Sequence, residues 1–372
     1  MNRNKISSAL INKVSAMSVD DNEKYDVIVT CSNFNKTKNL LNNYGFEYNC
    51  FNFANCFSLK LDNEDLNFIS NLDDITFVYE NSYVKAERLE QDVMNLNKLT
   101  EGKFLGQGQT ICFIDTGIYP HVDFLFPHSR LIKFIDLVNH NNTAYDDNGH
   151  GTFVAGIACG NDSLNSGFMG FAPKANIISI KALGKNGNSD SNKILDAMQW
   201  VYENHKALNI KVVCMSFGAD VVDNNDPLSL GAQALWKAGI TVVVAAGNSG
   251  PEKKTIKSPG NNPYVITVGA YDVGKNAIAD FSSRGPTIYG HKPDLVAPAV
   301  DITSCNNGLP FTTSMSGTSV AAPIVAGICA DILSRYPKAT NNQIKAFLLA
   351  NCTKITGDID KEGAGYLNFK NL

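Results

Sequence analysis

In this 372-residue chain, Ser319 has a local sequence that suits a catalytic nucleophile. Apolar residues follow it at Val320, Ile324, Ile328 and Leu333, and this spacing predicts a largely buried helix that begins near the serine. A hydroxyl in the first turn of a helix meets free backbone N–H groups and the positive end of the helix dipole. Such a place suits a nucleophile whose reaction passes through an oxyanion. The same serine could simply cap the helix.

A histidine and an aspartate supply what such a serine lacks. A serine hydroxyl needs a histidine to take its proton, and the histidine works best when a carboxylate fixes its tautomer and orientation. His150 stands between two glycines ahead of an apolar run, and Asp115 ends a run of β-forming residues that begins at Thr110. Carboxylates at the ends of parallel strands point into the ligand crevice. Alone, His150 could equally be a core or capping histidine.

These segments resemble the three signatures of the subtilisin family of serine proteases, the subtilases, in the family's order of Asp, His and Ser. They read Ile114-Asp115-Thr116-Gly117, Gly149-His150-Gly151-Thr152 and Gly317-Thr318-Ser319. A fourth segment, residues 242–250, resembles the strand that carries the family's oxyanion-hole asparagine, and Asn248 takes that place. By itself Asn248 would be an ordinary turn residue. The resemblance covers residues 88–372, and four motifs in one order make coincidence remote.

Strand-like and helical patterns alternate through this part of the chain. Strands are expected at 110–115, 175–181, 212–216, 241–246 and 264–268, and helices after His150, at 191–205, at 228–238 and from Ser319. This alternation is typical of an α/β fold in which helices cover both faces of a parallel sheet. The resemblance implies a subtilisin-like catalytic domain over residues 88–372, with active residues at the carboxyl ends of the strands.

Residues 1–87 are interpreted as a separate unit. After a polar lead-in, the patterns predict a strand at 25–31, a helix at 35–44 and a strand-like run at 48–61 that counts as two strands. A helix at 62–72 and a strand at 75–79 follow. Such an order gives a small ferredoxin-like α+β domain with a four-stranded antiparallel sheet and two helices on one face. By pattern and position it resembles the subtilase propeptide, which assists folding and then inhibits the enzyme by leaving its last strand in the cleft. A small domain that binds something else is the alternative.

The resemblance also implies where the chain is cut. Placing residues 77–81 on the family's last propeptide strand puts self-cleavage after Glu87, with Arg88 opening the mature domain. The boundary is expected within residues 82–95, and N-terminal sequencing of the purified protein would test it. The protein would then be made as a zymogen.

Substrate is expected to bind as an added strand between two exposed backbone segments. By the resemblance these segments are 184–189 and 216–218, and the binding residues in them are Gly184, Gly187, Ser216, Phe217 and Gly218. The first segment would otherwise be interpreted as a flexible polar turn.

Lys257 falls in the pocket that receives the residue before the scissile bond. The resemblance implies walls at 216–218 and 246–248 and a floor at 256–260, where the family often has a small residue in place of this lysine. An ammonium in a partly desolvated pocket would favour an acidic side chain through charge-assisted hydrogen bonds, which agrees with Glu87 as the self-cleavage residue. A lysine that simply points to water is the alternative.

Bulk properties give no sign of other partners. A formal charge of −4 and a pI near 5.9 give no reason to expect binding to nucleic acid or to an anionic membrane. The first ten residues lack the apolar core of a signal peptide, and we expect no later run to be long or uncharged enough to span a bilayer. Nine cysteines without paired or metal-ligand spacing suit reduced thiols. We therefore expect a cytoplasmic protein whose partners are peptide substrates and its own propeptide.

Two departures from the family bear on cofactors and packing. The loop at 160–167 resembles the shorter family form, and the calcium-binding loop of the secreted enzymes is not evident in it. We expect no obligatory calcium, no other metal and no cofactor. Phe153 stands where the family commonly has a histidine, and only packing should change.

The preferred function is a serine endopeptidase in which His150 takes the proton of Ser319 and Asn248 stabilises the oxyanion. Three alternatives stay open. Aspartic proteases share the tripeptide at 115–117 but need a second copy, which this sequence lacks. A metallohydrolase could use His121, Asp123, Asp146, Asp147 and His150, although their spacing matches no helix-borne metal motif. A catalytically silent subtilase relative that binds a partner is the third.

Overall fold

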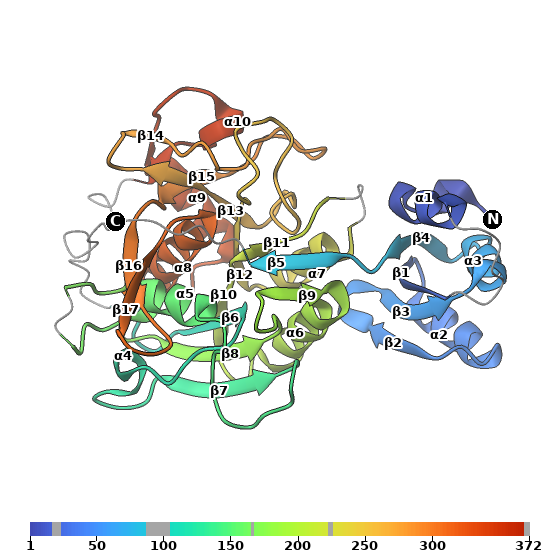
Figure 1. The fold of residues 1–372 in the computed structure, drawn as a ribbon, viewed down its shortest axis with the longest axis horizontal. Helices are drawn as coiled ribbons and strands as arrows, with labels where there is room; N and C mark the ends of the chain where they lie inside the picture. Colours follow the sequence, from blue (N-terminus) through green and yellow to red (C-terminus); the bar gives the residue numbers. More distant parts are fainter. Residues whose placement is uncertain (17–23, 87–104, 165–166, 222–225, 368–372) are drawn as a thin grey trace.

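A computed structural model describes residues 1–16, 24–86, 105–164, 167–221 and 226–367. Its largest feature is a ten-stranded sheet in the order β18-β19-β15-β13-β12-β10-β6-β8-β7, with β14 paired to β13. Figure 1 labels its strands from β15 to β7. The central strands are β6 (Thr110–Asp115), β8 (Asn176–Lys181), β10 (Ile210–Met215), β12 (Thr241–Ala245) and β13 (Ile266–Asp272). These pair in parallel with their neighbours along the path, as do β7 (Leu131–Asp136) and β15 (Leu295–Pro298). The expected parallel sheet is confirmed.

The edge pairings are shorter. β14 (Ala277–Ile278) and β18 (Cys352–Thr353) are antiparallel to their partners, and β19 (Tyr366–Leu367) is parallel to β15. Every residue of β6 and of β12 is buried. Strands covered on both faces need apolar residues on both sides, which is why these segments are nearly continuous runs of Val, Ile, Phe, Ala and Cys.

Two layers of helices cover the sheet. One layer has α5 (His150–Cys159) packed against α8 (Thr318–Arg335), and the other has α6 (Ser191–Asn204) packed against α7 (Pro227–Lys237). The sequence sets the starts of these helices: the carboxylates of Asp190 and Asp226 cap α6 and α7. Further helices are α4 (Val122–Leu125), α9 (Asn341–Ala350) and α10 (Ile359–Glu362).

α8 corrects one expectation. By length and composition this 18-residue helix is apolar enough to cross a membrane, contrary to the prediction that no segment is. However, 89% of it is buried inside the fold, where it touches β6, β10, β12, β13 and β15. Its apolar character on all sides is therefore that of a core helix.

The N-terminal unit has a sheet of its own, in the order β2-β3-β1-β4 and antiparallel throughout. Its elements are β1 (Tyr25–Cys31), α2 (Phe34–Asn43), β2 (Tyr48–Phe51), β3 (Cys56–Leu61), α3 (Asn63–Ser70) and β4 (Ile75–Glu80). The predicted order of strands and helices is present. The run at 48–61 is divided by a 3-10 turn, η2 (Asn52–Ala54), which ends at Asn55 in a left-handed backbone conformation with φ 52°.

The start of the chain is more than a polar lead-in. A 3-10 turn, η1 (Arg3–Lys5), precedes the helix α1 (Ser8–Ala16). Ile6 forms a parallel bridge with Val78, and the buried side chain of Leu10 joins the core of the N-terminal unit. Two apolar anchors thus hold a segment that has mostly polar residues around them.

A strand links the two parts of the molecule. β5 (Tyr83–Ala86) leaves the N-terminal unit and lies between β9 (Asn188–Asp190) and β11 (Phe217–Gly218) in a three-stranded antiparallel sheet (Figure 1). A two-stranded sheet of β16 (Ile302–Cys305) and β17 (Thr312–Met315), which the sequence patterns did not predict, packs its first strand on α5.

Candidate active site

The structure brings Asp115 and His150 into direct contact. Asp115 ends β6, His150 begins α5, and His150 Nδ1 lies 2.7 Å from Asp115 Oδ1. Both side chains are 2% exposed. The same carboxylate oxygen accepts the backbone N–H of Thr116 at 2.7 Å. A carboxylate on Nδ1 keeps the ring proton on that nitrogen, so Nε2 becomes the proton-accepting end of the imidazole.

The loop before His150 is organised by Asp146, a residue that the sequence analysis considered only as a metal ligand. Its Oδ1 accepts the N–H groups of Asn148 and Gly149, and its Oδ2 accepts the N–H and hydroxyl of Thr152. The hydroxyl of Thr116, next to Asp115, also donates to Asp146 at 2.9 Å. One buried carboxylate therefore ties the loop of the histidine to the strand end of the aspartate. The local signal for this turn is an aspartate that precedes Asn148 by two residues and Gly149 by three.

Glycine is required where these segments meet. A Cβ on Gly151 would lie 2.1 Å from the Gly117 carbonyl oxygen, and a Cβ on Gly117 would lie 2.3 Å from the Tyr145 carbonyl oxygen. No side chain fits at such distances. The glycines in the two motifs thus let the strand end and the helix start approach closely enough for the Asp115–His150 contact.

Ser319 is the second residue of α8 and is 2% exposed. α8 begins at the end of β12, where Thr318 contacts Asn248, while α5 begins at the end of β6. Only β10 separates β6 from β12, so these strand ends lie about 10 Å apart. The starts of α5 and α8 therefore share the carboxyl edge of the sheet, and this brings Ser319 to the side of the molecule that holds His150.

Asn248 has its amide oriented by the residue before Ser319. Its Oδ1 accepts both the backbone N–H of Thr318, at 2.9 Å, and the Thr318 hydroxyl, at 3.0 Å. The Thr318 hydroxyl also receives the N–H of Gly247 at 3.1 Å. An amide whose oxygen is held on one side turns its NH₂ group the other way, as a hydrogen-bond donor. Thr318 was missed by the sequence analysis as the residue that sets this orientation.

The two segments expected to bind substrate lie on either side of β5. Ala86 and Lys85 pair with Phe217 and Gly218 of β11, and on the other edge Lys85 pairs with Asn188. The N–H of Ala86 donates to the carbonyl of Gly187 at 2.8 Å. The loop at 184–187 is closed by the N–H of Gly187, which donates to the Gly184 carbonyl at 2.8 Å. Ser216 is fully buried between β10 and β11.

Lys257 does not point freely to water. Its side chain is 19% exposed, and its Nζ lies 2.5 Å from Oδ1 of Asp220, whose side chain is 90% exposed. The stem of the lysine packs on Gly247, since a Cβ placed on that glycine would lie 2.5 Å from Lys257 Cγ. Asp220 was not among the residues predicted for the site.

The five residues considered as metal ligands do not gather at one point. Asp146 uses both oxygens on N–H and O–H donors, and Asp147 pairs with Lys181 at 2.6 Å. His121 and Asp123 lie instead beside Cys305. In the described part of the chain, this is the one group of three potential ligands whose ligand atoms lie within 4.8 Å of one another.

Two predictions fall on residues without a described structure. Glu87 and Arg88, at the proposed cleavage point, lie outside the described residues, as do 165 and 166 of the loop that resembles the shorter family form.

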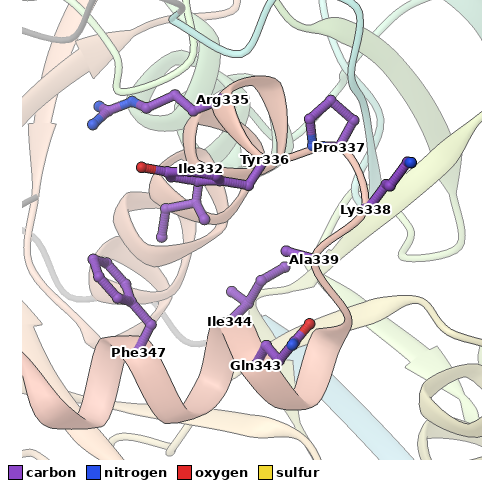
Figure 2. A pocket seen from close by; sticks show the side chains of 9 residues that line it. All are labelled: Ile332, Arg335, Tyr336, Pro337, Lys338, Ala339, Gln343, Ile344 and Phe347. Carbon is purple, nitrogen blue, oxygen red and sulfur yellow. The ribbon is translucent and has the colours of Figure 1, made fainter.

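A hollow elsewhere on the molecule is unrelated to this site. Figure 2 shows a pocket between the end of α8 and α9. Its lining residues are Ile332, Arg335, Tyr336, Pro337, Lys338, Ala339, Gln343, Ile344 and Phe347. It lies at the end of α8 opposite to Ser319, about 20 Å along an 18-residue helix. Its lining holds no serine, cysteine, histidine or carboxylate, so it lacks the groups for acyl transfer.

Comparisons with known proteins show what the chain is similar to. The family model described as "Subtilase family" matches residues 106–366. "Serine protease AprX" of Bacillus subtilis (strain 168) is 39% identical over 361 residues, which cover 86% of this chain and 79% of the relative. "Thermostable alkaline protease" of Halalkalibacterium halodurans is 35% identical over 241 residues, or 64% and 61% of the two chains. "Subtilisin DY" of Bacillus licheniformis is 32% identical over 279 residues, or 74% and 94%.

Proposed function

Because this chain belongs to the subtilase family and is a subtilisin-like serine endopeptidase, we propose that Asp115, His150 and Ser319 form its catalytic triad. The observation that carries the proposal is the buried 2.7 Å contact between His150 Nδ1 and Asp115 Oδ1, at the sheet edge where α8 begins. Asn248, with its amide held by Thr318, is proposed as the oxyanion-hole donor.

The proposed reaction is acyl transfer in two halves. His150 takes the proton of the Ser319 hydroxyl, the oxygen attacks the peptide carbonyl, and the leaving amine receives the proton from the imidazolium. Asp115 holds the ring in the required tautomer and stabilises its charged form. Asn248 and the Ser319 backbone N–H stabilise the tetrahedral oxyanion. Water then enters by the same steps and releases the acid.

The N-terminal unit is proposed to be a propeptide, so that the protein is a zymogen with domains 1–87 and 88–372. The position of β5 supports this, because the chain's own strand occupies the place between β9 and β11 that an extended substrate would take. Self-cleavage is proposed after Glu87, the residue that follows β5, with the boundary within 82–95.

The same arrangement supports peptides in extended form as the substrates, held by Gly184, Gly187, Ser216, Phe217 and Gly218. The propeptide is then an inhibitor within the same chain. We further propose that the protein acts in the cytoplasm and needs neither nucleic acid nor a membrane, in line with its charge of −4 and nine free thiols.

Intact mass of the purified chain tests these proposals together. The wild type should split near residue 87, and Ser319→Ala should stay whole. Ser334→Ala, which removes a serine from the far end of the same helix, is the matched control and should split like the wild type.

Labelling by a fluorophosphonate probe separates the remaining cases. If the wild type stays whole but Ser319 is labelled, the triad stands and self-cleavage is wrong. If no label is found, the triad is wrong. Asn248→Ala should lower turnover by about a hundredfold or more, a range taken from subtilisin itself rather than from this structure.

A further inference from the structure

Lys257 lies beside two chain segments at the carboxyl edge of the sheet. The neighbouring strands β10 and β12 end side by side, which leaves residues 216–218 and 246–248 facing one another. The N–H of Lys257 donates to the Ala246 carbonyl at 3.0 Å. The next residue, Ser258, exchanges two backbone hydrogen bonds with Ala219, at 2.9 and 3.0 Å. Lys257 is therefore fixed to one wall by its own backbone, and its neighbour Ser258 is fixed to Ala219, which directly follows the other wall.

The two partners of the ion pair have unequal settings. The Lys257 side chain is 19% exposed with its stem against Gly247, next to Asn248, whereas the Asp220 side chain is 90% exposed. An ammonium that is largely withdrawn from water needs an anionic or hydrogen-bonding partner. The Asp220 carboxylate is already largely hydrated, so it can leave for water at little cost to itself, provided that another anion takes its place on the ammonium. The cation is fixed and its counter-ion is replaceable.

We propose that this pair selects an acidic residue immediately before the scissile bond, with the substrate carboxylate taking the place of Asp220 on Lys257. This rests on the proposed function, since it assigns a substrate class to the same site. The exchange keeps one anion on the ammonium before and after binding. A neutral substrate side chain in the same position gains no ion pair. It would lie beside Lys257, which stays paired with Asp220.

The register of β5 supports the position. Lys85 is opposite Gly218, and Ala86, the last residue of β5, is opposite Phe217, which belongs to one of the walls beside Lys257. In the sequence, Glu87 follows Ala86 and comes immediately before the proposed cleavage point. The chain's own residue at the proposed cleavage point is thus the acid that the pair would select.

Peptide hydrolysis by the self-processed full chain tests the proposal. The substrates are acetyl-Tyr-Val-Lys-Ala-X amides, which copy residues 83–86 and carry Glu, Gln or Leu at X. Active enzyme is counted by fluorophosphonate titration, and the result is the ratio of kcat/KM for Glu to that for Gln. Glu and Gln have nearly the same shape, so the ratio isolates charge. We expect roughly tenfold in favour of Glu in the wild type, as a charge-assisted hydrogen bond provides.

Three variants assign the preference to its residues. Lys257→Met should bring the ratio to about one or below, because the carboxylate loses its partner. Lys253→Met, which removes an exposed lysine from the same loop, should keep the wild-type ratio. Asp220→Asn should raise the ratio several-fold, by roughly the effect of removing one competing anion. Because each ratio is taken within one variant, a loss of folded protein does not change it.

The outcomes distinguish this inference from the function on which it rests. A wild type that is labelled and hydrolyses the Gln or Leu peptide as fast as the Glu peptide overturns the inference and keeps the protease. An Asp220→Asn ratio equal to that of the wild type overturns the exchange. If Lys257→Met does not fold, the wild-type ratio and Asp220→Asn still decide. A wild type that is neither labelled nor active overturns the proposed triad as well.

Discussion

Two buried pairs of histidine and aspartate in the described part of the subtilase region differ in which atoms meet. In the first, His150 Nδ1 contacts the carboxylate of Asp115 directly, at 2.7 Å. In the second, His121 Nδ1 accepts the backbone N–H of Asp123 at 3.1 Å, and the carboxylate lies farther away, at 3.8 Å. The other nitrogen of His121 donates to the Phe311 carbonyl at 3.0 Å.

The ring protons of the two histidines are therefore on different nitrogens. Because His121 Nδ1 accepts the backbone N–H of Asp123, this nitrogen must be unprotonated. The ring proton is therefore on Nε2, which donates it to the Phe311 carbonyl. A carboxylate on Nδ1 of His150 requires the reverse, and Nε2 is the acceptor. The Asp123 carboxylate accepts the N–H groups of Asp162 and Ser163, at 3.2 and 3.1 Å. This second pair closes a set of loops and has no nitrogen arranged to take a proton from a nucleophile.

The difference shows that burial and proximity do not identify a catalytic histidine. Burial lowers the pKa of His121 and raises the pKa of Asp123, so the second pair has the perturbed titration that often marks an active site. Hydrogen-bond direction separates the two pairs. The predictions below set one pair against the other.

The largest contrast is expected in turnover on removing each imidazole. His150→Ala should lower kcat by roughly 10⁶-fold, the loss known for subtilisin when its base is removed. His121→Asn, which keeps an acceptor for the Asp123 N–H, should stay within about tenfold of the wild type, as expected for a residue without a role in transition-state binding. Initial rates of peptide hydrolysis at saturating substrate measure both. Equal losses would mean that the two pairs cooperate in catalysis.

A smaller contrast is expected for the carboxylates. Asp115→Asn should lower kcat by about 10⁴-fold, as in another serine protease, because the amide stabilises the wrong tautomer of the histidine. Asp123→Asn keeps an oxygen for the loop N–H groups and should lose far less. The rate of fluorophosphonate labelling of Ser319 gives the same comparison without a peptide. If labelling of Asp115→Asn were as fast as in the wild type, Asp115 would not orient the base.

Stability should show the opposite order. His121→Ala removes the cap of α4 and leaves the Asp123 N–H and the Phe311 carbonyl without their partner, which should lower the free energy of unfolding by about 1–3 kcal/mol. His150→Ala should lower it by less than His121→Ala does, because it removes one hydrogen bond rather than two and Asp115 still accepts the Thr116 N–H. Urea unfolding in a Ser319→Ala background, which prevents self-digestion, measures both. A larger loss for His150→Ala would contradict the assignment of the structural role to His121.

The smallest effect is expected in the dependence of stability on pH. Since burial lowers the pKa of His121 in the folded state, the unfolded chain binds more protons at pH values below the ordinary 6.5. Stability should therefore fall as the pH drops from 6.5 toward the lowered pKa, by at most about 1.4 kcal/mol per pH unit. The raised pKa of Asp123 has the opposite effect: between the ordinary value of 3.8 and the raised pKa, the folded chain binds more protons, so stability should rise as the pH drops. His121→Asn in the Ser319→Ala background should have a flatter profile, and an unchanged slope would assign the titration to another group.

Much of the fold follows from local pattern. The runs at 25–31 and 110–115 become β1 and β6 with the predicted limits, and the helix expected at 191–205 is α6 within one residue. Continuous apolar strands, helical spacing and capping carboxylates depend on neighbours a few residues apart, which is why the sequence predicts them. The motifs around Asp115, His150 and Ser319 are equally local, and they suggested the family before any contact was known.

The sequence by itself determined the family, the class of fold and the residues whose chemistry fits. Tertiary structure alone decided which histidine meets its aspartate through the carboxylate and that Lys257 pairs with Asp220, 37 residues away. It also decided that Leu10 of α1 is buried in the core of the N-terminal unit, in a segment that the sequence patterns treated as a polar lead-in. The reason is physical: a pattern records what each residue prefers among its sequence neighbours, whereas hydrogen-bond direction and ion pairing depend on groups that meet only when distant segments pack.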